Sequence, residues 1–249
     1  MKINDKKMKY LSKITNSIYE ELKVEFLYHS NHLEGSTFSK EELDKLLNEK
    51  KVEGNHSLDD VIETRNSLEL FDQVICDSSE QLDKFMLFNW HRILKKSTVD
   101  EEIHNVGMWK KYGNKLRNVD LKLAYPEEVE SLMYNLLADW NSISDASLKD
   151  IANFHYKFER IHPFQDGNGR IGRFIILKQC LEKNIDLIAI DNEYGDEYRK
   201  ALYKAQTTDD SEELVNVFKK CQNRLDKKLE SFDNLLNQVE EEIESSNEE

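Results

Sequence analysis

Glycine and proline are scarce in this sequence, which contains only eight glycines and two prolines among its 249 residues. Because these residues form turns and interrupt helices, and because apolar residues recur at helical spacing, we expect a mainly α-helical protein. Cysteine is also rare: Cys76, Cys180 and Cys221 are widely spaced and match no pairing motif. This pattern excludes a disulfide scaffold and suits a reducing compartment, so we predict a cytoplasmic protein with these cysteines in its core.

Long apolar runs are missing too, since no stretch approaches the roughly 20 apolar residues that a membrane span requires. The N-terminus, MKINDKKMKY, is too polar for a signal peptide. Acidic residues outnumber basic ones by 49 to 35, which gives a formal net charge of −14. This balance argues against a nucleic-acid partner and against an anionic membrane. Apolar residues make up 39% of the chain, enough for the core of one large domain.

Helical spacing and capping signals divide the chain into three parts. Residues 1–56 are predicted to be an N-terminal helical segment, in which an apolar stripe from Met8 to Phe26 indicates one helix running to about Leu33. Residues 57–207 are the predicted core, and residues 208–249 are predicted closing helices with an acidic tail. Capping residues predict helices that begin near Ser39, Ser57, Pro126, Ser147 and Gly167.

One segment of the core lacks the helical pattern. Residues 106–123 carry Gly107 and the turn dipeptide Gly113-Asn114 between two short mixed runs, VGMWKKY and VDLKL. These runs predict the two arms of a short β-hairpin. The segment is also a basic island in an acidic chain, through Lys110, Lys111, Lys115 and Arg117.

Three of the eight glycines and one of the two prolines fall within residues 162–173, which read HPFQDGNGRIGR. Pro163 ends one predicted helix, and another begins near Gly167. Backbone N–H groups at the start of a helix are unpaired and carry partial positive charge, and glycine lets them curl around an anion. The turn therefore predicts an anion site, most often a site for phosphate.

The reactive side chains of this stretch suit a polyphosphate. Arg170 and Arg173 lie on one face of the predicted helix and can bind the same anion through paired hydrogen bonds. Asp166 offers a hard oxygen to a magnesium ion, and His162 can accept a proton near neutral pH. The alternative is an ordinary turn between helices in which each of these residues is structural. A P-loop is excluded, because no lysine follows the glycines.

HPFQDGNGRIGR resembles the signature of Fic-domain proteins, H-x-F-x-[DE]-G-N-G-R-x-x-R, and every specified position matches. The preceding IANFHYKFERI resembles the family's helix before the motif, and a weaker resemblance covers about residues 57–205. The resemblance implies a mainly helical Fic-type fold with a short β-hairpin flap. It also implies transfer of AMP from ATP to a hydroxyl group on a protein, with Mg²⁺ or Mn²⁺ as the metal cofactor.

The resemblance implies a role for each residue of the motif. His162 would deprotonate the target hydroxyl, and Asp166 would hold the metal ion between the α- and β-phosphates. Arg170 would bind the β-phosphate and Arg173 the γ-phosphate. The anion hole would consist of Gly167, Asn168 and Gly169.

Two further parts of the site follow from the same resemblance. In the family a β-hairpin flap aligns the backbone of the target protein by strand addition, which is the role expected for residues 106–123; the alternative is an ordinary surface loop. The adenine pocket lies partly on the helix after the motif helix, here DEYRKALYKAQ. Tyr198 and Gln206 are its candidates, although they could equally be surface or core residues of a helix.

A second motif suggests regulation. SNHLEG, residues 30–35, resembles the inhibitory motif S-x-x-x-E-G of many family members. By this resemblance, Glu34 pairs with Arg173 and occupies the place of the γ-phosphate, while Ser30 helps to hold the segment. A carboxylate can replace a phosphate oxygen at a guanidinium, so this autoinhibition is chemically sound. The alternative is an ordinary helix end capped by Gly35.

We therefore predict an autoinhibited protein adenylyltransferase, and three alternatives stay open. The same site could remove AMP from a modified protein as a phosphodiesterase, with Glu34 as the base. A metal hydrolase could use His155, His162 and Asp166. A non-enzymatic module could sense nucleotides without AMP transfer. The expected partner is a protein with a hydroxyl side chain, the chain itself included, and a homo-oligomer is left open.

Overall fold

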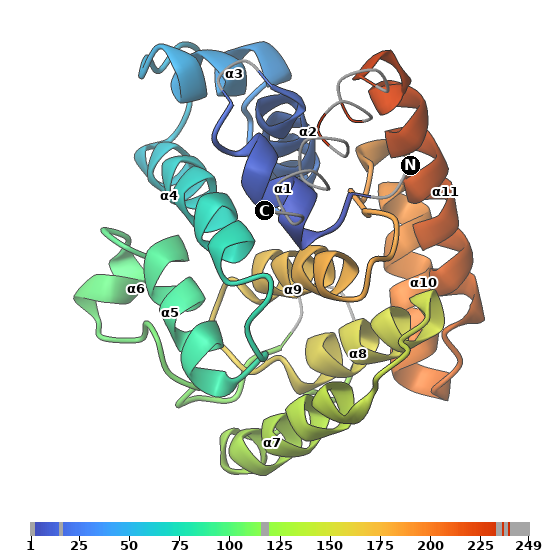
Figure 1. Ribbon diagram of the computed structural model, residues 1–249. Helices are drawn as coiled ribbons and strands as arrows, with labels where there is room; N and C mark the ends of the chain where they lie inside the picture. Colours follow the sequence, from blue (N-terminus) through green and yellow to red (C-terminus); the bar gives the residue numbers. More distant parts are fainter. Residues whose placement is uncertain (1–2, 15–16, 116–119, 233–235, 237–238, 240–249) are drawn as a thin grey trace.

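The computed structural model describes residues 3–14, 17–115, 120–232, 236 and 239 (Figure 1). Within this part of the chain the regular structure is entirely helical. The α-helices are α1 (Asp5–Leu11), α2 (Ile18–Leu33), α3 (Lys40–Asn48), α4 (Leu58–Cys76), α5 (Lys84–Leu94), α6 (Val99–Glu102), α7 (Pro126–Ser142), α8 (Leu148–Ile161), α9 (Asn168–Glu182), α10 (Gly195–Thr208) and α11 (Glu212–Leu229). Two short 3₁₀-helices, η1 and η2, span Asn192–Tyr194 and Glu230–Phe232.

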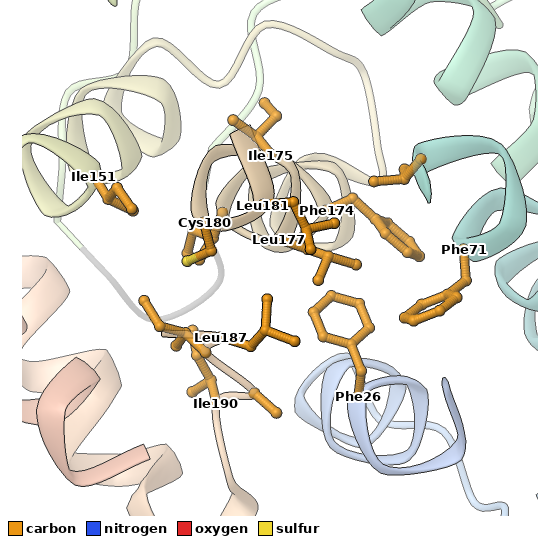
Figure 2. Packing of buried hydrophobic residues seen from close by; sticks show 14 of the residues in the cluster. Phe26, Phe71, Ile151, Phe174, Ile175, Leu177, Cys180, Leu181, Leu187 and Ile190 are labelled. Atoms are coloured by element: carbon orange, nitrogen blue, oxygen red, sulfur yellow. The ribbon is translucent and has the colours of Figure 1, made fainter. Parts of the chain in front are cut away.

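Helix α9 lies at the centre of the fold, in contact with α2, α4, α5 and α8 (Figure 1). Its residues are apolar on several faces, so nearly all of it is buried. Figure 2 shows Phe174 of α9 beside Phe26 of α2, with the two ring centroids 5.2 Å apart. Phe71 of α4 continues the row at 5.7 Å from Phe26. Each buried ring of this kind contributes about 1.5–3 kcal/mol, so α2 is anchored to the central helix.

The helix starts predicted from capping residues are confirmed. The hydroxyl of Ser39 accepts a hydrogen bond from the backbone of Glu42, and the reciprocal bond completes a capping box. Ser147 forms a capping box with Asp150 at the start of α8, whereas Ser57 caps α4 with a single bond from the backbone of Asp60, and Pro126 occupies the first turn of α7. All three cysteines are free, and Cys180 and Cys221 are buried as predicted, but the prediction of a core position is wrong for Cys76, which is exposed at the end of α4.

The single N-terminal helix predicted to reach Leu33 is wrong, because the chain divides it into α1 and α2. Ser17 marks the break: its hydroxyl accepts a hydrogen bond from the backbone of Tyr19 and donates one to the carbonyl of Leu11. The apolar spacing did not reveal the break because both helices bury their apolar residues in the same core. The division of the chain at residues 56 and 207 stays a prediction.

The predicted β-hairpin is not supported. No strand is formed by residues 106–115 or 120–123, and residues 116–119, with Arg117 among them, lie outside the described residues. The physical reason is that the first arm bonds to the motif turn rather than to a second strand. The backbone N–H of Lys110 donates to the carbonyl of Pro163 at 2.7 Å, and the side chain of Asn114 donates to the carbonyl of Phe164 at 3.1 Å.

The basic island is correspondingly less exposed than the sequence indicates. Lys110 is buried, and its ammonium group donates to the carbonyl of Ile161 and to the side chain of Asn114. Of the acidic tail, residues 240–249 lie outside the described part of the chain. No helix in the described ranges combines the length and the apolar character that a bilayer crossing requires.

Candidate active site

The motif forms a tight turn between α8 and α9. His162 ends α8, as predicted for the residue before Pro163, and its backbone is left-handed, with φ +52°. Gly167 starts α9 with φ +79°, a conformation that favours glycine. The side chain of Asn168 closes the turn, because it accepts from the backbone N–H of Phe164 at 2.8 Å and donates to its carbonyl at 2.9 Å. This bonding fixes the start of α9 relative to the end of α8, where His162 lies.

A carboxylate already lies at this helix start. Glu34, which caps the C-terminal end of α2, places its Oε1 2.7 Å from Nη2 of Arg173. Gly169 makes the approach possible, since a Cβ atom there would lie 2.3 Å from the same oxygen. Ser30 holds the other side of the guanidinium, with its hydroxyl 2.9 Å from Nε and its carbonyl 2.9 Å from Nη2. The structure thus brings together the two sequence motifs in one contact.

The charges of this contact are fixed at neutral pH. The side chain of Arg173 is 4% exposed and that of Glu34 is 39% exposed. Partial burial alone would raise the pKa of Glu34, but Arg173 and Arg170 outweigh it and lower that pKa. The pair is therefore an ion pair, and its buried arginine would be left without a partner if Glu34 withdrew with nothing to replace it.

Arg170 points to a different carboxylate. Its Nη1 lies 2.6 Å from Oε2 of Glu63 on α4, whereas its Nη2 is 3.8 Å from Asp166. The expectation that both arginines bind one anion is therefore not met in this state, in which each arginine has its own glutamate.

The ammonium group of Lys95 completes this network. Lys95 follows α5, and its side chain is 2% exposed. It lies 2.6 Å from Glu63 and 2.9 Å from Asp100, and it also pairs closely with Asp166. Sequence reasoning missed Glu63 and Lys95, because no motif or spacing distinguishes them from other charged residues of their helices.

Asp166 fits the role of a metal ligand. Its side chain is 59% exposed at the mouth of the turn. Partial burial would raise the pKa of Asp166, but Lys95 and Arg170 lower that pKa to about 2, so the carboxylate is ionised. One carboxylate of this kind, completed by phosphate oxygens and water, is the donor set that Mg²⁺ usually takes in nucleotide sites.

A separate cluster, Glu25, His29 and Asp191, brings three metal-ligating side chains within 4.8 Å of one another. It lies between α2 and η1 and is already balanced by cations. Lys40 and Lys228 pair with Glu25, and Arg224 pairs with Asp191. We therefore interpret it as an internal ion cluster that joins α2 to α3, η1 and α11.

The metal hydrolase alternative required His155, His162 and Asp166 to gather around one ion. Among the described residues these three do not form such a group. His155 instead places its Nε2 2.7 Å from the hydroxyl of Tyr198, in the interior between α8 and α10. That alternative is wrong for this structure.

His162 is the predicted general base of this site. Its side chain is 16% exposed, and burial lowers the pKa of His162 to about 4, with the nearby Lys110 adding to the effect. The imidazole is therefore neutral at physiological pH and can accept a proton.

Comparisons with known proteins indicate the family of the chain. Residues 81–180 match the model of the Fic/DOC family. The chain carries a Fic domain. A curated relative from Nematostella vectensis, named protein adenylyltransferase Fic, is 25% identical over 187 residues. The match covers 70% of this chain but only 42% of that relative.

Two solved structures share the fold. A Fic-domain-containing signalling protein from Bacteroides thetaiotaomicron is 23% identical with a TM-score of 0.72, and the match covers 89% of this chain and 93% of that chain. A segment of Fic-1 from C. elegans is 18% identical with a TM-score of 0.72, over 89% of this chain and 67% of that chain. The predicted helical Fic fold is therefore confirmed.

The two residues predicted to line the adenine pocket of the Fic domain are both buried on α10. Tyr198 bonds to His155, as described above, and the carbonyl of Gln206 accepts a hydrogen bond from Arg160 at 3.2 Å. Their role in binding adenine stays a prediction.

Proposed function

We propose that this chain is a protein adenylyltransferase, which transfers AMP from ATP to a Ser, Thr or Tyr hydroxyl of a protein, and that Glu34 holds it inactive. The observation that carries the proposal is the contact of Glu34 with Arg173 at the start of α9. A carboxylate at this place uses the groups that a γ-phosphate would need. The family match and the name of the Nematostella relative support the reaction class.

The proposed mechanism uses positioning and charge. His162 takes the proton of the target hydroxyl, whose oxygen attacks the α-phosphorus of ATP. The bond between the α-phosphorus and the bridging oxygen breaks, and pyrophosphate leaves. Arg170 and Arg173 bind the β- and γ-phosphates, and the backbone N–H groups from Gly167 to Gly169 stabilise the charge that develops.

Asp166 is the residue that would hold the divalent metal ion, Mg²⁺ or Mn²⁺. The bound ion would neutralise oxygens of the α- and β-phosphates, which lowers the repulsion met by the attacking hydroxyl. In the absence of the ion, Lys95 balances the charge of Asp166.

We further propose that the target protein docks against residues 106–115, because this segment lies along the motif turn through Pro163 and Phe164. The target class is any protein with an accessible hydroxyl side chain, including a second copy of this chain. We expect neither nucleic acid nor membrane as partner, and a cytoplasmic location.

One observation favours a second candidate that uses the same site. Glu34 is ionised and partly exposed beside the start of α9, so it could accept a proton from a water molecule. The protein would then remove AMP from a modified target instead of adding it. Release of free AMP from a modified protein by the wild type would identify this activity.

The deciding experiment compares wild type and Glu34→Gly. Each protein is incubated with labelled ATP and Mg²⁺, alone and in a cell lysate, and AMP incorporation is measured by intact mass and by label. We expect the variant to incorporate AMP much faster than the wild type, and a chelator to stop the reaction. ATP binding by Glu34→Gly without any transfer would instead indicate a nucleotide-sensing module.

A further inference from the structure

A buried glutamate, Glu159, lies next to His162, the proposed base. Glu159 lies one helical turn before His162 on α8, and its side chain is 8% exposed. Its Oε2 is 3.9 Å from Nδ1 of the imidazole. Within the described part of the chain, neither Oε1 of Glu159 nor Nδ1 of His162 has a hydrogen-bond partner of good geometry, although the main-chain carbonyl of Glu159 lies near Nδ1. Burying unpaired polar atoms is costly, so an unpaired atom on each of these two neighbouring side chains calls for a functional reason.

The motif provides the space for this carboxyl group. A Cβ atom on Gly172 would lie only 2.4 Å from Oε1 of Glu159. Gly172 stands inside α9, where glycine is unfavourable, and the Fic signature leaves its position unspecified. Neither the turn nor the anion site requires a glycine there. Its absent side chain is what lets the Glu159 carboxyl rest against α9.

We propose that Glu159 is a positioning residue for His162: its carboxyl accepts a hydrogen bond from Nδ1–H and thereby keeps Nε2 free to take the target's proton. An imidazole can serve as base at Nε2 only if its proton is on Nδ1, and an acceptor at Nδ1 selects that tautomer. The separation of 3.9 Å closes by a small side-chain rotation, as is common when substrate tightens a site. The inference rests on the proposed base role of His162.

The charge around Glu159 indicates how it would act. Burial raises the pKa of Glu159 to about 8, an effect that Arg173 opposes and Glu34 favours. Two ionisable groups nearby, His155 on the same helix α8 and Tyr198 on α10, are uncharged there. At neutral pH the carboxyl is therefore largely protonated and accepts through a neutral oxygen. An amide oxygen should serve equally well.

This distinction gives the kinetic test. In the Glu34→Gly background, Glu159→Leu should lower kcat at least about tenfold with little change in the KM for ATP, because a misplaced tautomer affects the chemical step. Glu159→Gln, which has the same size and retains an acceptor, should stay within about threefold of its parent. An unchanged kcat in Glu159→Leu would overturn the proposal, since a purely structural acid is replaced by leucine without kinetic loss.

A spectroscopic test does not depend on the reaction. In ¹⁵N-histidine-labelled protein, the ring signals of His162 are assigned by their loss in His162→Ala. We expect Nδ1–H in the wild type and in Glu159→Gln, and a shift toward Nε2–H in Glu159→Leu. The main-chain carbonyl of Glu159 also faces Nδ1. If the tautomer is the same in all three proteins, that carbonyl is sufficient and the proposal is wrong, whatever the Glu34→Gly experiment gives.

Gly172→Ala provides a second route that leaves Glu159 in place. The new methyl group should push the carboxyl away and reproduce the tautomer shift. In a Glu159→Leu/Gly172→Ala double variant, the added methyl group should cause little further shift, because both changes remove the same contact. Equal and additive shifts would contradict the assignment.

Discussion

His162 combines a left-handed backbone with a mostly buried ring at the junction of α8 and Pro163. We predict that His162→Ala lowers AMP transfer by about 10²–10⁴-fold, because a positioned general base contributes this much to the rate. ATP affinity should change only a few-fold, since the imidazole acts on the target hydroxyl. Single-turnover rates and binding titrations in the Glu34→Gly background separate the two effects. His104→Asn, an exposed histidine that also has a positive φ, is the control.

Glu159 makes a prediction about stability. Its folded pKa of about 8 exceeds its ordinary value, so protonation favours the folded state and the stability it contributes is lost as pH rises. Relative to Glu159→Gln, the wild type should lose on the order of 3 kcal/mol between pH 4 and pH 7, at about 1.4 kcal/mol per pKa unit. Urea unfolding of both proteins at several pH values measures this difference.

The exposed Glu127→Gln is the control for that series, and it should run parallel to the wild type. Parallel curves for Glu159→Gln as well would mean that the carboxyl of Glu159 is ionised or solvated in the folded protein. They would also remove the neutral acceptor on which its action at His162 depends.

At the scale of single residues, the sequence identified those candidate site residues that share a short motif. His162, Asp166 and the two arginines are close in space because they are close in sequence, and local helix geometry suffices to place them. Glu34 was found because its own motif names it. Glu63, Lys95 and Glu159 were missed, because only tertiary packing or the absence of a side chain at Gly172 decides what they touch.

Among the elements, helix starts were predictable because a cap is a local interaction between neighbouring residues. The conformation of residues 106–115 was not predictable, because the hydrogen-bond partners of this segment lie about 50 residues away in the motif turn. A glycine-asparagine pair between two mixed runs is compatible with a hairpin but also with a loop laid along another turn. Here the packing of Trp109 favours the loop. Its ring centroid lies 5.3 Å from that of Phe164 and 4.5 Å from that of Phe88.

The side chain of Asn114 is the link that we expect to hold this segment on the motif. It donates to the carbonyl of Phe164 at 3.1 Å and accepts from Lys110 at 2.9 Å. We predict that Asn114→Ala speeds amide hydrogen exchange in residues 106–115 by about five- to tenfold, since each lost hydrogen bond is worth about 1 kcal/mol. Helix α9 should exchange at its original rate.

The matched control for this prediction is Asn141→Ala. Asn141 makes the same kind of bond, from its side-chain amide to the carbonyl of Leu82 at 2.9 Å, but neither residue belongs to the motif or to residues 106–115. Asn141→Ala should leave amide hydrogen exchange in residues 106–115 unchanged. Equal acceleration of that segment by both variants would mean that the exchange reports general loosening and not the loss of the Asn114 contact.

On the scale of the whole molecule, the contact between Glu34 and Arg173 joins residues 139 positions apart. Helix α2 carries Glu34 and is fixed at two other places, by Phe26 in the core and by the ion cluster around Glu25 and His29. Moving the whole helix would break both attachments. Release of Arg173 therefore requires only the C-terminal end of α2 to change, where Glu34 is a partly exposed cap.

Because the proposed inhibition acts through one contact, a double-mutant cycle of Glu34 and Arg173 can test it. If Glu34 and the γ-phosphate compete for Arg173, Glu34→Gly should raise AMP transfer, by about 100-fold or about 2.7 kcal/mol if the closed state exceeds the open one by about 100 to 1. Arg173→Ala should be slow, because the γ-phosphate has lost its partner. Adding Glu34→Gly to Arg173→Ala should restore little, since both act through one side chain. The test compares the AMP-transfer rates of the wild type, the two single variants and the double variant. If Glu34→Gly accelerates Arg173→Ala as much as it accelerates the wild type, Glu34 inhibits through some other group.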